Sequence, residues 1–165
     1  MWALVLFTVL TTSVLADNDC MKYIQPHYLK ECCKMGLPDP PAIHLHPIKE
    51  CLSLPNEAPA CEQDICSTTK KGLASADGKL DKSKLKEHTE KFFESSPELS
   101  KAITENCIDR DISKIGPPDM CEFTRYRACV GVQLAMMCPE WSNEGECAGS
   151  KVAFAECARK IKMEA

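Results

Sequence analysis

The chain has 165 residues, a formal net charge of −4 and twelve cysteines. Its lysines and arginines are interleaved with acidic residues, which argues against nucleic acid or an anionic membrane surface as a partner. The first sixteen residues, MWALVLFTVLTTSVLA, are apolar, too short to span a bilayer, and end with the small residues Val14 and Ala16, which suit signal-peptidase cleavage. We therefore expect residues 1–16 to be a cleaved signal peptide, with a membrane anchor or a buried strand as the alternative, and residues 17–165 to form one secreted domain without membrane insertion.

Residues 18–35 have a helical pattern that is interrupted near Pro26. The following stretch, residues 37–59, contains six prolines and is predicted to be an irregular loop, held in place by Cys51. Residues 59–71 can form a helix that carries two cysteines. Residues 75–78, SADG, are typical of a turn.

Asp81 is placed to cap a strongly charged helix over residues 81–96. The apolar stripe of this helix is expected to contain Leu85 and Phe92, with His88 and Phe93 as further candidates. Pro97 predicts the start of the next helix, residues 97–110. Its shared face is expected to contain Leu99, Ile103 and Cys107.

The stretch CEFTRYRACVGVQLAMMCPEW, residues 121–141, has helical spacing of its apolar residues, with Asp119 as a candidate cap and Pro139 at or just beyond the end. Ser150 predicts the start of a last helix. No alternating strand pattern occurs in the sequence. The predicted fold class is all-α, a compact bundle of six to eight short helices.

All twelve cysteines follow the signal segment, and an even number in an exported chain indicates disulfides, about six if all of them pair. Zinc is the alternative, but the paired spacing of zinc ligands is missing, and His44 and His46 lack acidic or cysteine ligands in register. We expect neither a metal nor another cofactor. The predicted disulfide cysteines are Cys20, Cys32, Cys33, Cys51, Cys61, Cys66, Cys107, Cys121, Cys129, Cys138, Cys147 and Cys157.

The helix predicted from residue 121 is apolar on two sides, which indicates a position in the middle of the domain. At 100° per residue, Cys129 and Cys138 lie about half a turn apart, on opposite flanks of the main apolar stripe. They are therefore expected to bond to different elements. Because disulfides hold such a domain from outside, its interior can remain incompletely filled, and an internal apolar cavity could then host a ligand.

The spacing of Cys129, eight further residues, Cys138 and then Pro139 resembles that of insect odorant-binding proteins, and the proline after Cys138 resembles their twelve-cysteine Plus-C type. In this resemblance Cys107, Cys66 and Cys61 match the earlier cysteines of the family frame, although four residues separate Cys61 from Cys66 where the family has three. The resemblance implies the pairs Cys33 (or Cys32) with Cys66, Cys61 with Cys129, and Cys107 with Cys138. It leaves the other six cysteines unassigned.

The resemblance further implies a carrier that binds small hydrophobic, odorant or pheromone-like molecules reversibly in an internal pocket. The expected setting is sensillum lymph or another body fluid, with a membrane chemoreceptor as a further partner and the chain as a monomer or weak dimer. Tyr126 is the best polar candidate in the pocket, because a buried hydroxyl needs a partner. The candidate lining residues are Phe123, Tyr126, Val130, Leu134, Met137, Phe92, Leu99, Ile103 and Phe154.

An enzyme is not expected, because the cysteines are better used in bridges than as nucleophiles and no GxSxG motif or phosphate-binding glycine loop is present. The competing interpretation is a secreted, disulfide-rich interaction module, such as an inhibitor or antagonist. Its contact surface would be the proline-rich loop of residues 37–55. Simple core packing is the competing explanation for each residue proposed to line the pocket.

Overall fold

The computed structural model describes residues 20–35, 48–57 and 60–160. The predicted signal peptide, the larger part of the proline-rich loop and the pair His44 and His46 lie outside these residues. The described residues form six α-helices and no strand, so the predicted all-α class is confirmed. These helices are α2 (Pro26–Cys32), α4 (Glu62–Lys70), α5 (Lys82–Phe92), α6 (Pro97–Ile103), α7 (Glu122–Met136) and α8 (Ser150–Lys160).

Shorter helical turns link these elements. Three of them are 3-10 turns: η1 (Lys22–Ile24), η2 (Lys49–Cys51) and η4 (Gly145–Cys147). The fourth, η3 (Thr104–Asp109), is a π-helix that continues α6 directly. In the described part of the chain, no helix has the length and apolar character needed to cross a membrane.

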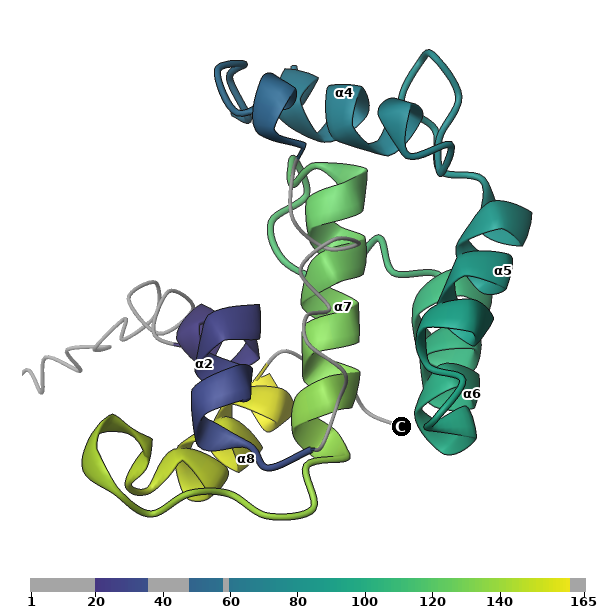
Figure 1. Cartoon of the computed structure of the whole chain (residues 1–165). Coiled ribbons are helices and arrows are strands. Elements are labelled where there is room, and N and C mark those ends of the chain that lie inside the picture. The colour runs from purple at the N-terminus through teal and green to yellow at the C-terminus, as the bar shows by residue number, and fades with distance from the viewer. Residues whose placement is uncertain (1–19, 36–47, 58–59, 161–165) are drawn as a thin grey trace, which may run out of the picture.

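Helix α7 occupies the centre of the molecule (Figure 1). Helix α4 crosses near its N-terminal end, α5 and α6 lie together on one side, and α2 and α8 lie on the other side (Figure 1). All of the side chains from residue 128 to residue 135 are buried. This burial confirms that α7 is an interior helix with apolar residues on more than one side.

Several helix boundaries follow from local chemistry. The carboxylate of Asp81 accepts hydrogen bonds from the backbone amides of Ser83 and Lys84, at 2.9 and 3.2 Å, and so caps α5 as predicted. Pro26 and Pro97 occupy the first helical positions of α2 and α6, where a missing amide hydrogen has no consequence. The capping prediction for α7 is wrong, because this helix begins after Cys121 and not after Asp119.

The buried stripe of α5 differs from the expected one. Leu85 and Thr89 are buried on this helix, and Phe93 at its C-cap is also buried. Phe92 is only half-buried and packs against the edge of the core. Because one step along a helix rotates a side chain by about 100°, Phe93 continues the Leu85 and Thr89 row and Phe92 lies beside it.

Six disulfide bonds use all twelve cysteines. Three of them attach α7 to other segments: at its start Cys121 bonds to Cys61, in its middle Cys129 bonds to Cys107, and after its end Cys138 bonds to Cys33. Cys129 and Cys138 therefore bond to different segments, as the helical geometry predicted. The remaining bonds are Cys20 to Cys157, Cys32 to Cys147 and Cys51 to Cys66.

All three pairings implied by the family resemblance are wrong in this structure. Cys61 precedes α4 and lies near the start of α7, where it bonds to Cys121. Cys129 is eight residues farther along α7, about 12 Å along the helix axis and beyond the reach of the same sulfur. The π-helix η3 places Cys107 beside the middle of α7, so Cys107 bonds to Cys129 and leaves Cys138 for Cys33.

Gly131 allows η1 to approach the centre of α7. A Cβ atom added at Gly131 would lie 2.4 Å from the carbonyl oxygen of Ile24 and 2.9 Å from its Cβ. We expect Gly131→Ala to lower the free energy of unfolding by about 1–2 kcal/mol, because an overlap with backbone atoms costs about 2–3 kcal/mol, the upper part of the range for overpacking, and the better helix propensity of alanine recovers about 1. Urea denaturation measures the change. A Gly131→Ala variant as stable as the parent chain would contradict the close packing of η1.

Candidate ligand-binding site

The residues predicted to line a pocket lie in or beside one continuous hydrophobic core. Most of them are buried, whereas Phe92 and Met137 are half-buried at its edge. Helix α6, to which Leu99 and Ile103 belong, and helix α8, to which Phe154 belongs, lie on opposite sides of α7 (Figure 1). Phe154 stacks on Trp141 with ring centres 6.0 Å apart. The buried members are Phe123, Tyr126, Val130 and Leu134 of α7, Leu99 and Ile103 of α6, and Phe154 of α8.

A partly open groove of about 540 Å³ lies between the start of α5, the end of η3 with the residues after it, and the first turns of α7. This volume falls in the range of pockets that bind small organic molecules. Of the predicted lining residues, Tyr126 lines this groove. Its other apolar residues are Leu80, Leu85, Cys107, Ile108, Ile112 and Met120, and its polar or charged residues are Lys82, Asp109, Arg110, Asp111, Ser113, Glu122 and Arg125.

Tyr126 supplies one of the polar atoms of this groove, whose wall combines apolar and charged residues. Its side chain is buried, and its hydroxyl lies 3.3 Å from the hydroxyl of Thr89 on α5, with either group able to donate. Burial raises the pKa of the Tyr126 hydroxyl, and the hydrogen bond to Thr89 partly opposes this effect. The phenol therefore stays neutral at physiological pH and can orient a ligand by hydrogen bonding alone.

Arg125 fixes the loop that forms one end of the groove. Its buried guanidinium donates hydrogen bonds to the carbonyl oxygens of Ser113, Pro117, Pro118 and Met120, the last three at 2.9, 3.3 and 3.1 Å. One side chain thus holds four backbone carbonyls of a turn that contains two consecutive prolines. Arg125 gives this end of the groove a defined shape.

A second groove of about 560 Å³ lies over α5, α6 and η3, and its character is different. It contains the acidic side chains of Glu90, Glu94, Glu105 and Asp109. Asp109 forms an ion pair of 2.7 Å with Lys86 of α5. None of the residues predicted to line a pocket lies in this second groove, whereas Tyr126 lies in the first.

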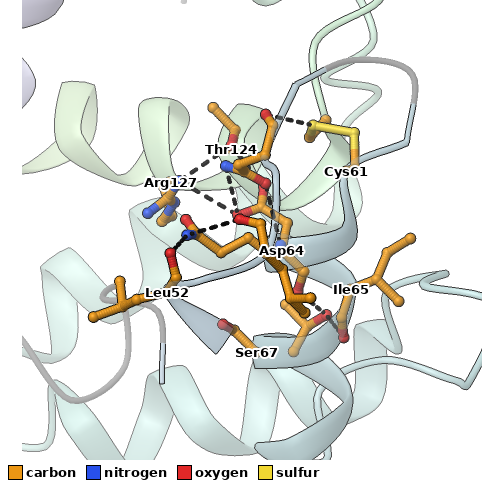
Figure 2. A network of polar contacts seen from close by, with 12 residues as sticks. Leu52, Cys61, Asp64, Ile65, Ser67, Thr124 and Arg127 are labelled. Atoms are coloured by element: carbon orange, nitrogen blue, oxygen red, sulfur yellow. Dashed lines mark hydrogen bonds and ion pairs between the residues drawn. A yellow bond between two sulfur atoms is a disulfide. The ribbon is translucent and has the colours of Figure 1, made fainter. Parts of the chain in front are cut away.

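Asp64 joins α4 to the first turns of α7 (Figure 2). Its carboxylate is 3% exposed and accepts hydrogen bonds from the Thr124 hydroxyl at 2.6 Å and from the Asn56 side-chain amide at 3.3 Å. Arg127 of α7 approaches the same carboxylate at 3.6 Å. The side-chain oxygen of Asn56, Oδ1, accepts a hydrogen bond from the Asp64 backbone amide at 3.2 Å. A buried carboxylate with this many partners fixes how the two helices meet.

Two cations lie against the ring of Phe123 beside this network. The guanidinium carbon of Arg127 is 5.3 Å from the ring centre, and the ammonium nitrogen of Lys71 is 5.7 Å from it. Burial first, and then the charge of Arg127, lower the pKa of Lys71 to about 8, against the opposing effect of Asp64. Burial also lowers the pKa of His88 on α5. The positive charges of Lys71 and Lys91 lower this pKa further, whereas the negative charge of Glu87 raises it.

The sequence did not predict a role at a site for the polar residues described above, which are Asp64, Lys71, Arg125 and Arg127. Arg125 and Arg127 carry a signal, because they are two basic residues in a helix that is predicted to lie in the middle of the domain. Asp64 and Lys71 belong to residues 62–71, a stretch with several charged side chains that is typical of a solvent-exposed surface. Within the described ranges, no group of three or more His, Cys, Asp or Glu side chains is arranged to hold a metal ion.

No protein-family model matches the chain, and neither the curated proteins nor the solved structures include one that is significantly similar to it. Function is therefore inferred from the side chains and disulfides described above.

Proposed function

We propose that this chain is a secreted carrier that binds small hydrophobic molecules reversibly, as its resemblance to the Plus-C type of insect odorant-binding proteins implies. The supporting observation is the groove of about 540 Å³ that reaches the buried phenol of Tyr126. Its apolar residues would hold the body of an odorant-like or pheromone-like ligand, and polar groups such as the Tyr126 hydroxyl would orient it. No covalent chemistry is needed for this role.

The groove has walls of fixed shape. Cys107 lines it and is bonded to Cys129 on α7, so η3 and the central helix keep their spacing whether or not a ligand is present. Arg125 fixes the loop at one end through four carbonyl oxygens. Walls that are ordered before binding reduce the entropy lost when a ligand enters.

The cysteine pairing gives no support to membership of that family, because it differs from the pairing that the resemblance implies. The six disulfides fit an extracellular chain, since such bonds persist in oxidising compartments. The proposed partners are a small hydrophobic ligand in a body fluid and a membrane chemoreceptor that receives it.

The test is displacement of an environment-sensitive fluorescent probe, N-phenyl-1-naphthylamine, from residues 17–165 with intact disulfides. A panel of medium-chain alcohols, aldehydes and esters is expected to displace the probe saturably with micromolar affinity. Ile112→Arg should weaken displacement by at least ~10-fold, because it places a charge among the apolar residues of the groove. Val152→Arg is the matched control, since Val152 is 65% exposed on α8. Absence of displacement across the panel would refute the carrier function.

One observation favours the alternative, a secreted protein-interaction module. Leu52 belongs to the described part of the proline-rich loop and is 55% exposed. The bond between Cys51 and Cys66 anchors this part of the loop to α4. An exposed leucine on an anchored loop can contact a partner protein. A chain that fails to displace the probe, but loses binding to a partner protein after Leu52→Asp, would support this function instead.

A further inference from the structure

The second groove, over α5, α6 and η3, carries two carboxylates that have no basic partner in the described part of the chain. Its volume of about 560 Å³ is within the range of sites for small organic molecules. Asp109 is paired with a lysine of α5, and Glu105 lies 3.9 Å from Lys101. Among the described residues, the carboxylates of Glu90 and Glu94 form no ion pair or hydrogen bond. Both lie at the end of α5, where their like charges repel each other.

Helix α6 and η3 bring two hydroxyl groups to the same groove. Ser100 and Thr104 line it, and neither hydroxyl forms a hydrogen bond within the described residues. Ser100 is only 7% exposed, and a hydroxyl this deeply placed normally has a partner. In the described ranges, the side-chain polar atoms that are enclosed without a partner are the Nε atoms of Arg125 and Arg127. The Ser100 oxygen is therefore not enclosed, and it is accessible from the groove that Ser100 lines.

We propose that this second groove binds a small organic amine in its protonated form, with an ammonium group on a short apolar body. A primary ammonium group has three hydrogen-bond donors and no acceptor. The groove offers it the carboxylates of Glu90 and Glu94 and the hydroxyl of Ser100, all of which can accept. Hydrogen bonds between a cation and a carboxylate are stronger than bonds between neutral groups. Pro97 and Phe93 line the groove beside these acceptors and provide contacts for the apolar body.

This site goes beyond the carrier function and does not depend on it. Asp109 lines both grooves, but Glu90, Glu94 and Ser100 line the second groove and not the groove at Tyr126. A chain that binds no hydrophobic ligand at Tyr126 could still bind an amine here, and a functioning carrier could lack the amine site. The two proposals therefore fail separately, one in probe displacement and the other in amine binding at α5, α6 and η3.

The experiment titrates residues 17–165, with intact disulfides, with phenethylamine at pH 7 and low salt, and follows the backbone amides by nuclear magnetic resonance. The amide signals of Glu94, Ser100 and Thr104 are expected to shift saturably. Phenethyl alcohol has the same apolar body without the charge, so it should bind at least ~5-fold more weakly. The proposal is overturned by equal affinity for the alcohol, by the absence of saturable shifts, or by shifts centred on Ile112 and Tyr126 in the first groove.

Variants of exposed acids separate the site from the net charge of the chain. Glu90→Gln with Glu94→Gln should weaken phenethylamine binding at least ~5-fold and leave phenethyl alcohol unchanged, because both unpaired charges are removed. Glu31→Gln with Glu156→Gln is the matched control, since it changes the net charge equally at exposed positions of α2 and α8 and should retain the affinity. Ser100→Ala should weaken the amine ~3-fold through the lost acceptor. Equal losses in the two double variants would overturn the proposal.

Discussion

Replacing Cys107 and Cys129 together by alanine is expected to lower the free energy of unfolding by about 3–4 kcal/mol. Their bond closes a sequence separation of 22 residues, and both cysteines are almost completely buried between η3 and α7. Its loss increases the entropy of the unfolded chain and leaves unfilled space in the core. Guanidinium denaturation followed by circular dichroism measures the change. An unchanged midpoint would show that packing alone holds η3 in place.

Cys51→Ala with Cys66→Ala is the matched control for this variant. That bond closes a separation of 15 residues, so its loss should destabilise the chain by a similar amount, about 3 kcal/mol. Neither cysteine lines the groove at Tyr126. Probe affinity should therefore weaken after loss of the Cys107 bond and persist after loss of the Cys51 bond. Equal losses of affinity would mean that general destabilisation, and not groove shape, controls binding.

Asp64→Ala is expected to lower the free energy of unfolding by about 3 kcal/mol. The substitution removes the acceptor of the Thr124 hydroxyl and the partner of the Asn56 amide, and it takes away the carboxylate that Arg127 approaches at 3.6 Å. Polar groups packed between α4 and α7 would then lack partners, which is more destabilising than the loss of exposed contacts. Thermal and urea denaturation both report the effect.

Two further substitutions divide this effect into its parts. Asp64→Asn keeps a carbonyl oxygen for Thr124 but removes the charge, so its expected loss is about half that of Asp64→Ala. Thr124→Val removes one hydrogen bond, with an expected loss of about 1–1.5 kcal/mol. If Asp64→Ala were as stable as Thr124→Val, the carboxylate would contribute little beyond its bond to Thr124.

The helices of this fold could be predicted where local chemistry specifies them. Asp81 caps α5 through two backbone amides, Pro97 begins α6, and Ser150 begins α8. Each signal acts within about one turn of the chain and needs no tertiary contact. The π-helix η3 has no comparable signal, because its wider turn depends on how Cys107 meets α7.

The disulfide pairing depends on how distant segments meet, which the spacing of cysteines does not specify. Cys61 bonds to Cys121 because α4 crosses near the start of α7, a tertiary arrangement without a local signature. The candidate site could be predicted only in part for the same reason. Helical periodicity predicts correctly that Tyr126 and Leu134 are buried, but not that Tyr126 alone of the two lines the groove. The environment of Lys71 likewise arises from three separate helices.

The bonds of the adjacent residues Cys32 and Cys33 bear on resistance to proteolysis. Their partners, Cys147 and Cys138, lie at the two ends of one exposed segment, and the Ser142 amide also donates to the Cys32 carbonyl oxygen at 2.8 Å. If a protease cleaves any peptide bond between these partners, both new chain ends stay tethered to neighbouring residues of the same molecule. Nicked protein would remain one covalent unit, with its central helix still attached at the cut.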